Sequence, residues 1–426
     1  MKIQKILKRL LQLHPKSIDL SLDRIKRLLK DLNNPEKKIN NAIQVVGTNG
    51  KYSFCSALRE IFETSGYSVN LNTSPSLRKF NERYYFSGKF ISDEKLYDLL
   101  IEVEKINNNK KITFHEFICA CFFLEASRNK SDVNILESGL FFRLDASNVL
   151  DKNIASVIMP IGIDHKDFLK TGTIDEIVYE KCSHLLNNSK IFISEQQNDV
   201  LQKIKKNISS NLSKKIFFGE NYKYKINNNG FVYEDAAGKI NLPLPNLLGD
   251  FQISNVSTAI VTARNLNQFK ITDNNIKKAI TKIRSEGRLQ TITSGKLRKY
   301  VSINNQILLD GAHNVLGAYA VKKYLETINS KKKIFMILGM MANKDHKKFI
   351  NIFKDIIQSV ITLNIPNQEN YMEKEKLSEI AKSCGVPSKT ENSIETALKN
   401  IAKENEDAII FCTGSLYLAG EILNLN

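Results

Sequence analysis

The chain has 426 residues, of which 42% are hydrophobic and 25% charged, and its formal net charge is +17. This composition excludes a disordered chain and suggests two or three domains, and no apolar run approaches the roughly 20 residues that cross a bilayer. The basic surplus consists of 50 Lys against 12 Arg, scattered without interleaved aromatic residues, so we expect no nucleic-acid partner.

The first part of the chain alternates strands and helices after a helical segment of about 40 residues. A β-branched strand is predicted at 42–46, followed by a turn at 47–50 and a helix that starts at Lys51 and stops at Gly66. Further strands are predicted at 69–71, 133–136, 155–161 and 191–194, and helices at 93–108, 113–128 and 173–187. This alternation predicts a parallel-rich sheet covered by helices.

The second part begins with a different pattern. Residues 222–243 read as small antiparallel strands, and amphipathic helices are predicted at 251–267 and 272–285. After a Lys-rich stretch at 294–299, strands are predicted at 307–309, 334–338, 360–365 and 408–412. We therefore predict an α/β protein with a larger N-terminal domain at 1–295, built on a parallel-rich sheet, and a smaller Rossmann-like C-terminal domain at 296–426.

The six cysteines lie mostly inside apolar runs and lack metal-knuckle spacing. The first 15 residues carry no secretory pattern. Both observations predict reduced core thiols in a cytoplasmic protein with no membrane partner.

A candidate phosphate loop joins the first predicted strand to its helix. In Gly47-Thr48-Asn49-Gly50-Lys51-Tyr52-Ser53, the glycines let backbone N–H groups turn toward a polyphosphate, and Lys51 adds positive charge. It is not a strict Walker motif, because Val45 stands at the place of the first Gly and the hydroxyl follows Lys51 by two positions. An ordinary strand–turn–helix corner is the structural alternative.

Polar residues follow several other predicted strands. Glu137 and His165 end two apolar strands, where an acid and an imidazole can hold a divalent ion over a phosphate. Residues 73–83 offer hydroxyls and Arg83 to an anionic substrate, and Asp310–Asn314 follow the first strand of the C-terminal domain. The alternatives are a solvated loop, a structural histidine and a capped turn. From spacing alone, Lys181 reads as a solvated helical lysine.

Together these segments resemble the bacterial folylpolyglutamate synthase/dihydrofolate synthase family of Mur-ligase-like enzymes. The resemblance covers nearly the whole chain, and its most specific parts are residues 73–83 and 310–314. The other matching segments are 14–16, 18–24, 47–53, 91–94, 113–117, Glu137 with 143–148, 163–165, 180–181, 248–255, 287–290, 339–345 and 414–417.

The resemblance implies an ATP-dependent ligase that works through an acyl phosphate, with a P-loop-type Mur-ligase ATPase domain at 1–295 and a glutamate ligase domain at 296–426. ATP phosphorylates a carboxylate of a pterin-bearing substrate, and the amine of L-glutamate then displaces phosphate to form an amide. ATP and Mg²⁺ at two sites are the implied cofactors. Dihydropteroate, folate and L-glutamate are the implied substrates of a monomer. We expect both family activities, with a single-activity ligase or a degenerate relative as alternatives. A P-loop switch and a basic nucleic-acid module are the rivals outside the family.

Site residues carry over from the resemblance position by position. The implied ATP-binding residues are Gly47, Thr48, Asn49, Gly50, Lys51, Ser53, Asn255, Arg288 and Asp310. The implied metal ligands are Ser53, Ser74, Glu137 and His165, and the implied substrate-binding residues are Arg83, His313 and Ser415. Lys51, His165, Lys181 and His313 are the implied catalytic residues, and Lys181 matches the family lysine that reacts with CO₂ to form a carbamate.

Three positions depart from the family pattern. Tyr52 replaces a loop glycine, Phe141 and Phe142 replace a Gly-Gly pair, and Cys182-Ser183 replaces a small Ala-Gly pair. Lost glycines restrict the backbone, and we expect the two phenylalanines to narrow or reshape the pocket. The charged and metal-binding positions are kept, which favours an active enzyme.

Overall fold

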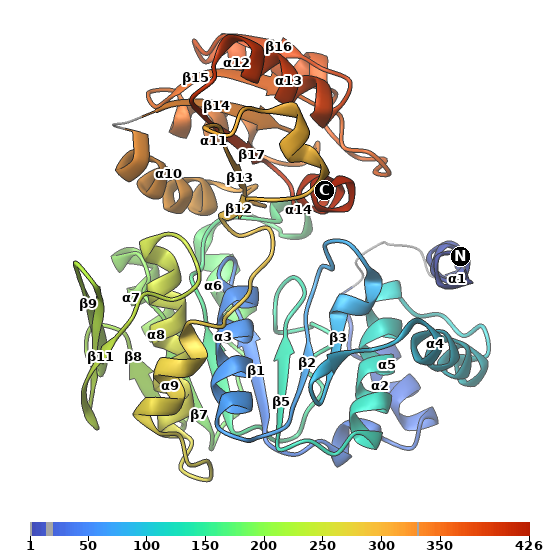
Figure 1. Cartoon of the computed structure of the whole chain (residues 1–426). Helices are drawn as coiled ribbons and strands as arrows, with labels where there is room; N and C mark the ends of the chain where they lie inside the picture. Colours follow the sequence, from blue (N-terminus) through green and yellow to red (C-terminus); the bar gives the residue numbers. More distant parts are fainter. Residues whose placement is uncertain (1, 14–19, 330–331) are drawn as a thin grey trace. The chain divides into compact units, whose positions relative to one another are not determined.

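The computed structural model describes residues 2–13, 20–329 and 332–426 (Figure 1). The matching segment 14–16 and part of 18–24 lie outside these residues. The chain divides into two compact units. The first comprises Met1–Pro245 and Ile253–Ile283, and the second comprises Asn246–Gln252 and Arg284–Asn426.

The first unit contains an eight-stranded sheet with the order β4-β3-β2-β5-β1-β6-β7-β8. Its strands are β1 (Ala42–Val46), β2 (Val69–Asn72), β3 (Tyr84–Phe86), β4 (Lys89–Phe90), β5 (Val133–Glu137), β6 (Ala155–Ile158), β7 (Lys190–Ile193) and β8 (Lys214–Phe217). All neighbours from β2 to β8 run parallel, and only β3 and β4 pair antiparallel at one edge. The predicted parallel-rich α/β sheet is confirmed.

Helices cover this sheet, and several of them begin at a residue whose side chain caps the helix. They are α1 (Lys2–Leu13), α2 (Asp23–Asp31), α3 (Lys51–Thr64), α4 (Asp93–Asn107), α5 (Phe114–Arg128), α6 (Ile174–Cys182), α7 (Asn198–Asn207), α8 (Asp250–Asn265) and α9 (Asp273–Ile280), with short 3-10 turns η1 (Pro35–Lys38), η2 (Phe80–Arg83) and η3 (Lys166–Phe168). Thr113 and Thr173 cap α5 and α6 by accepting a backbone N–H three residues later. These caps fix where α5 and α6 start.

The two ends of β1 contribute side chains to two different buried clusters. Val46 joins Ile158, Ile177 and Cys182 in a buried cluster beneath α6 and α7, whereas Ala42 joins a second cluster with α1, α2, α4 and α5. Helix α3 packs against β1, β2 and β5, and α9 lies beside it. These packed faces hold the loops at the carboxyl ends of the strands in place.

Phe142 lies in this core and not in a pocket, which corrects the expectation from the sequence. Its side chain is 1% exposed and belongs to the same buried cluster as Val46 and Cys182. Two of the departures, Phe142 and Cys182, therefore belong to the same buried cluster, and both add side-chain volume to the core.

We expect Phe142→Ala to lower the free energy of unfolding by about 3–5 kcal/mol, because the deletion leaves a cavity in this cluster. Denaturant unfolding followed by circular dichroism measures the loss. Phe90→Ala is the matched control, since Phe90 is 44% exposed, and should cost less than about 1 kcal/mol. Equal losses in the two variants would contradict the buried position of Phe142.

A three-stranded antiparallel sheet with the order β11-β10-β9 completes the first unit. Its strands are β9 (Tyr222–Asn227), β10 (Gly230–Asp235) and β11 (Gly238–Leu242), which agrees with the pattern predicted for 222–243. Its buried side chains are Tyr222, Phe231, Tyr233, Ile240 and Leu242.

The second unit contains a six-stranded sheet with the order β12-β13-β17-β14-β15-β16, parallel except for β12. Its elements are β12 (Gln290–Ile292), η4 (Lys296–Tyr300), β13 (Gln306–Leu309), α10 (Val315–Asn329), β14 (Lys333–Leu338), α11 (His346–Phe353), β15 (Ile357–Thr362), α12 (Lys374–Ser383), β16 (Ser388–Thr390), α13 (Ile394–Glu404), β17 (Ala408–Thr413) and α14 (Leu416–Leu425). The predicted C-terminal α/β fold is confirmed.

The two units divide earlier in the chain than the predicted boundary at 295/296. Strand β12 pairs antiparallel with β13, so residues 284–295 pack with the second sheet. Leu248 and Phe251 also pack against the core of the second unit. The Lys-rich stretch at 294–299 is a turn inside this unit and not a linker.

All six cysteines are free, and only Cys384 is partly exposed. No helix within the described residues is both long and apolar enough to cross a bilayer.

Candidate active site

The predicted phosphate loop lies where three parallel strands end side by side. Val45 of β1 pairs with Glu137 of β5, and Val46 of β1 pairs with Ile158 of β6. Strand β1 has β5 on one side and β6 on the other. The loops after these strands therefore meet at one edge of the sheet, the usual place for a ligand in an open α/β fold.

Hydrogen bonds fasten the loop to the segment that follows β6. The backbone N–H groups of Thr48 and Asn49 donate to the carbonyl of Pro160, at 2.9 and 3.2 Å. The Thr48 hydroxyl donates to the Gly162 carbonyl and accepts from its N–H, both at 3.0 Å. These contacts hold the loop, and the N-terminus of α3 provides the positive end of a helix dipole for an anion.

Gly50 permits a close approach between the loop and α8. Its φ of +80° lies in the left-handed region, and a Cβ there would stand 2.6 Å from Oδ1 of Asn255. A larger residue at position 50 would be strained and would displace Asn255. The structure thus brings the predicted ATP-binding residue Asn255, 205 positions later in the chain, to the loop.

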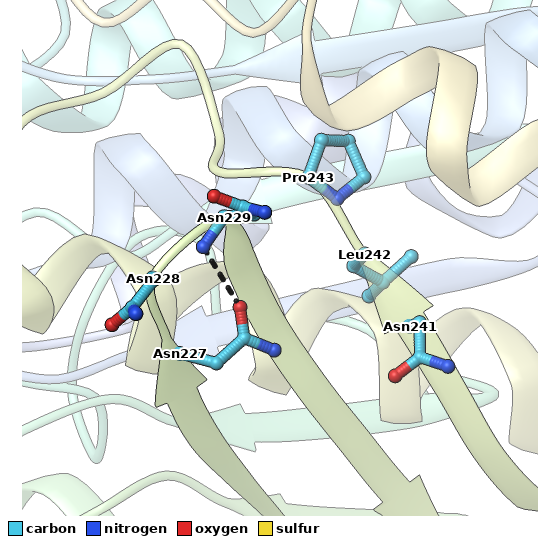
Figure 2. Close-up of a pocket in the computed structure, with 6 residues that line it drawn as sticks. All are labelled: Asn227, Asn228, Asn229, Asn241, Leu242 and Pro243. Atoms are coloured by element: carbon cyan, nitrogen blue, oxygen red, sulfur yellow. Dashed lines mark hydrogen bonds between the residues drawn. The ribbon is translucent and has the colours of Figure 1, made fainter.

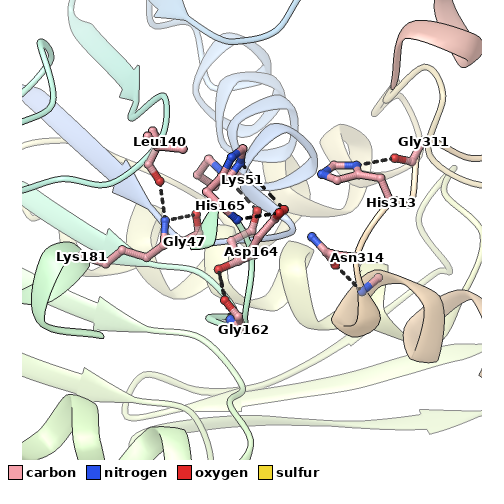
Figure 3. A network of polar contacts seen from close by, with 12 residues as sticks. Gly47, Lys51, Leu140, Gly162, Asp164, His165, Lys181, Gly311, His313 and Asn314 are labelled. Carbon is pink, nitrogen blue, oxygen red and sulfur yellow. Dashed lines mark hydrogen bonds and ion pairs between the residues drawn. The ribbon is translucent and has the colours of Figure 1, made fainter. Parts of the chain in front are cut away.

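Two lysines converge on one carbonyl of the loop (Figure 3). Nζ of Lys51 donates to the oxygen of Gly47 at 3.0 Å, and Nζ of Lys181 donates to the same oxygen at 3.1 Å. Lys181 also donates to the carbonyl of Leu140 at 2.7 Å. Lys181 is 4% exposed, so the alternative of a solvated helical lysine is wrong.

Burial first, and then the charge of Lys51, lower the pKa of Lys181 to about 7, although Asp164 acts in the opposite direction. Taking an ammonium out of water disfavours its charged form, and a second ammonium nearby adds repulsion. The lowered pKa therefore favours a neutral, nucleophilic amine on Lys181 at a lower pH than on a solvated lysine.

Acidic and hydroxyl groups stand beside the lysine pair. Oε1 of Glu137 lies 3.9 Å from Nζ of Lys51, and Oε2 accepts the backbone N–H of Ser74 at 3.1 Å. Glu137 and Ser53 are buried, at 4% and 2% exposed. The structure thus brings Ser74, Glu137 and Lys51 together from three different elements.

Arg83 closes the loop that carries Ser74. Its backbone carbonyl accepts the N–H of Thr73 at 3.0 Å, so the two ends of the segment 73–83 lie side by side. Its guanidinium lies over the ring of Phe80 in η2, 5.1 Å from the ring centre. This predicted substrate-binding residue is therefore held in the same loop as the predicted metal ligand Ser74.

His165 follows β6 in a left-handed conformation with a φ of 55°. Its backbone N–H donates to Oδ1 of Asp164 at 2.8 Å, and its Nε2 lies 3.8 Å from Oδ2 of the same residue. The Asp164 carboxylate thus fixes the backbone at His165 and lies near its imidazole.

The second unit gathers its predicted residues at the carboxyl end of β13. Asp310 is buried and accepts the N–H groups of Leu289 and Ala312 at 2.8 and 2.7 Å. Burial raises the pKa of Asp310 above its ordinary value, against the opposing charge of Arg288. Nη1 of Arg288 donates to the carbonyl of Gly287 at 3.1 Å.

His313 has its tautomer set by the turn that carries it. Nδ1 donates to the carbonyl of Gly311 at 2.8 Å, which leaves Nε2 as the other ring position (Figure 3). Ser415 caps α14 by accepting the N–H of Tyr417 at 3.1 Å. The preceding Gly414 donates to the carbonyl of Ala312 at 3.0 Å, so Ser415 lies next to the same turn.

Arg143, Asp145 and Glu180 lie in segments that match the family, but no role was predicted for them. Arg143 forms a two-pronged ion pair with Glu180, the residue before Lys181. Asp145 accepts N–H groups of the turn that contains Leu140. Their closeness to Lys181 depends on tertiary packing, although the segment 143–148 itself marked them for attention.

A separate hollow of about 640 Å³ lies at the three-stranded sheet and is lined by Asn227, Asn228, Asn229, Asn241, Leu242 and Pro243 (Figure 2). The N–H of Asn229 donates to Oδ1 of Asn227 within it. None of the predicted site residues lines this hollow.

Two protein-family models match the chain. The model described as the Mur ligase middle domain matches residues 45–263, and the model described as the dihydrofolate synthetase C-terminal domain matches residues 290–425. The two matches lie one after the other, in the same order as the N-terminal sheet and the C-terminal α/β unit.

Curated relatives match along most of the chain. The dihydrofolate synthase/folylpolyglutamate synthase of Buchnera aphidicola (subspecies Acyrthosiphon pisum) is 31% identical over 389 residues, which cover 89% of this chain and 88% of that protein. The folylpolyglutamate synthase of Lacticaseibacillus casei is 28% identical over 415 residues, which cover 94% and 92%.

Solved structures share the fold. Escherichia coli FolC in complex with DHPP and ADP superposes with a TM-score of 0.87 at 23% identity, covering 99% of this chain and 97% of that one. The Mycobacterium tuberculosis folylpolyglutamate synthase complexed with ADP and AMPPCP gives 0.86 at 22% identity, covering 100% and 99%. Together with the family models and the relatives, these similarities show that the chain belongs to the dihydrofolate synthase/folylpolyglutamate synthase family of Mur-ligase-like proteins.

Proposed function

We propose that this chain is an ATP-dependent ligase that joins L-glutamate to dihydropteroate and to reduced folates through an acyl phosphate. The observation that carries the proposal is the lysine pair on the Gly47 carbonyl, next to Glu137 and at the N-terminus of α3. This arrangement offers positive charge to a polyphosphate and an acidic side chain beside it. The names of the relatives support the same activity.

The proposed reaction proceeds in two steps. A carboxylate oxygen of the substrate attacks the γ-phosphorus of ATP, and ADP leaves. The amine of glutamate then attacks the acyl carbon, the C–O bond to phosphate breaks, and the amine gives up a proton as the amide forms. We assign Lys51 and the loop Gly47–Gly50 with Ser53 to the ATP phosphates. Asn255, Arg288 and Asp310 are assigned to the nucleotide, and Arg83, His313 and Ser415 to substrate carboxylates.

The residues present fit a divalent cation. Oε2 of Glu137 accepts the backbone N–H of Ser74 at 3.1 Å, and Nε2 of His165 lies 3.8 Å from Oδ2 of Asp164. Oxygen and imidazole donors of this kind suit Mg²⁺ and Mn²⁺. Ser53, Ser74 and Glu137 would hold one ion and His165 a second. An ion held by these residues would neutralise charge on the phosphates. The bifunctional folylpolyglutamate synthase/dihydrofolate synthase of Yersinia pestis has been solved in complex with AMPPNP and Mn ion.

The described ranges contain no group of three or more His, Cys, Asp and Glu side chains arranged around one point. The assigned ligands do not form such a group, because two of the four are serine hydroxyls.

Lys181 is assigned a carbamate, formed when its neutral amine attacks CO₂ and loses a proton. Its low pKa and its burial next to Lys51 support this assignment, because a negative carbamate would relieve the repulsion between two ammonium groups. We further propose a cytoplasmic monomer. A single-activity ligase is the second candidate, since one relative carries only the folylpolyglutamate synthase name.

Incubation of the pure protein with ATP, Mg²⁺ and glutamate tests the function, with dihydropteroate or a reduced folate as the acceptor. The proposal expects phosphate release that needs both glutamate and the acceptor. Release with only one acceptor would favour the single-activity candidate. Phosphate release at the same rate with and without glutamate would instead indicate an ATPase or a nucleotide-dependent switch.

A further inference from the structure

Lys181 is held by a short turn that runs from Gly139 to Asp145. The carbonyl of Leu140 accepts from Nζ at 2.7 Å, and the ring centre of Phe141 lies 5.4 Å from the same nitrogen. Phe141 is 2% exposed. The turn thus contacts the lysine with both an oxygen and an aromatic face, and the position of the turn fixes where Nζ lies.

The first half of this turn is fastened by Asp145. Its carboxylate accepts the N–H groups of Gly139, Leu140 and Ser147 at 3.0, 3.4 and 2.9 Å. Burial acts to raise the pKa of Asp145, but hydrogen bonds from His115 and Ser147 hold it at about 2. The charged carboxylate therefore keeps its N–H donors across the physiological pH range.

The second half of the turn is fastened to α6 by Arg143. Nε donates to both carboxylate oxygens of Glu180 at 3.0 Å, and Nη2 lies 2.9 Å from Oε1. The backbone N–H groups of Phe142 and Arg143 also donate to the carbonyl of Glu180, at 3.1 and 2.9 Å. Since Glu180 directly precedes Lys181, this pair sets the distance between the lysine backbone and its acceptor at Leu140.

We propose that Arg143 and Glu180 form a positioning pair for Lys181. They hold the Leu140 carbonyl and the end of α6 at a fixed spacing, so that Nζ stays at the edge of the phosphate loop. The inference rests on the proposed function, in which Lys181 acts beside the phosphates. A misplacement of about 1 Å in such a site can cost roughly 100-fold in rate.

Arg143→Lys and Glu180→Gln test the pair, because each keeps the side-chain size and loses the two-pronged ion pair. The matched control is Arg24→Lys. Arg24 donates to both oxygens of Glu116 at 3.0 and 2.7 Å, and these side chains are 15% and 5% exposed, against 27% and 9% for Arg143 and Glu180. The measurements are kcat, the KM of each substrate and Tm.

The two test variants should lose about 10- to 100-fold in kcat, with each KM changed less than about threefold. Arg24→Lys should lose as much in Tm and keep kcat within about twofold, because Glu116 does not border Lys181. Should a test variant fail to fold, the double variant Arg143→Met/Glu180→Leu replaces the pair by apolar groups of similar volume, which proteins commonly tolerate. It should show the same loss of kcat.

The outcomes separate the pair from the proposed function. A wild-type protein without glutamate-dependent phosphate release would overturn the ligase proposal itself. An active wild type with unchanged kcat in Arg143→Lys and Glu180→Gln would overturn the positioning pair alone. An equal loss of kcat in Arg24→Lys would also overturn it, because the effect would then follow from lost stability.

Discussion

Lys181→Ala should abolish ligation, with a loss of about 1,000-fold or more, and Lys181→Arg should not restore it. Neither side chain forms a stable carbamate, and arginine keeps a positive charge beside Lys51. The measurement is glutamate-dependent phosphate release at saturating ATP. Substantial activity in Lys181→Arg would reject the carbamate and leave Lys181 with a purely cationic role.

The dependence of activity on bicarbonate is a second test of the carbamate on Lys181. Wild-type protein prepared without CO₂ should lose activity, and added bicarbonate should restore it. Lys190→Ala is the control, because the pKa of this lysine is also lowered by burial while it lies on β7, away from the phosphate loop. Its activity should respond to bicarbonate as the wild type does.

The depressed pKa of Lys181 also predicts a pH dependence of stability. The folded chain releases the proton near pH 7, whereas the unfolded chain keeps it until about pH 10.5. The cost of burying the ammonium is therefore full below pH 7 and fades as the pH rises toward 10.5, so the free energy of unfolding should increase over this window. Lys181→Met should lack this increase, and an identical increase in that variant would contradict the assignment.

Lys51→Met should lower kcat/KM for ATP by about 100- to 1,000-fold, the loss that follows removal of one donor to developing charge. The methionine keeps the length of the side chain and loses the ammonium that donates to Gly47 and lies 3.9 Å from Glu137. The same variant should raise the pKa of Lys181, because a repelling charge disappears.

The control for Lys51 is Lys206→Met. Lys206 is exposed in the last turn of α7 and should be neutral in both activity and stability. A loss of less than about tenfold in Lys51→Met would show that the helix N-terminus alone binds the phosphates.

Local sequence patterns were sufficient to predict the strand, loop and helix that carry the candidate phosphate site. The β-branched run at Ala42–Val46, the glycines at 47 and 50 and the apolar periodicity after Lys51 predicted β1, the loop and α3 to within two residues at the end of the helix. Glu137 was also predicted at the end of β5, because an apolar strand that stops at an acid is visible in the sequence.

Elements with weak patterns were missed or misplaced. Strands β8, β12 and β16 are three or four residues long and partly exposed, so no apolar alternation marks them. Strand β15 lies at Ile357–Thr362 and not at 360–365, because its first half alternates with exposed residues while the apolar run continues past its end. Helix α6 ends at Cys182, earlier than the predicted 187, where a partly exposed turn follows.

The environment of Lys181 could not be derived from local sequence. Its acceptors lie 41 and 134 positions away, at Leu140 and Gly47. Only the family resemblance singled it out, whereas the helical pattern favoured a solvated side chain. The joint placement of Phe142 and Cys182 in one cluster likewise needs the folded sheet, because each residue alone reads as an isolated departure.

The central claim is ligation of glutamate through a phosphorylated carboxylate, and a single isotope measurement tests it. The acceptor is dihydropteroate labelled with ¹⁸O in its carboxylate, and mass spectrometry follows both products. The account predicts a pterin product heavier by one glutamate residue and inorganic phosphate that carries one ¹⁸O atom for each amide formed. Unlabelled phosphate, or labelled substrate recovered without an added glutamate, would contradict it.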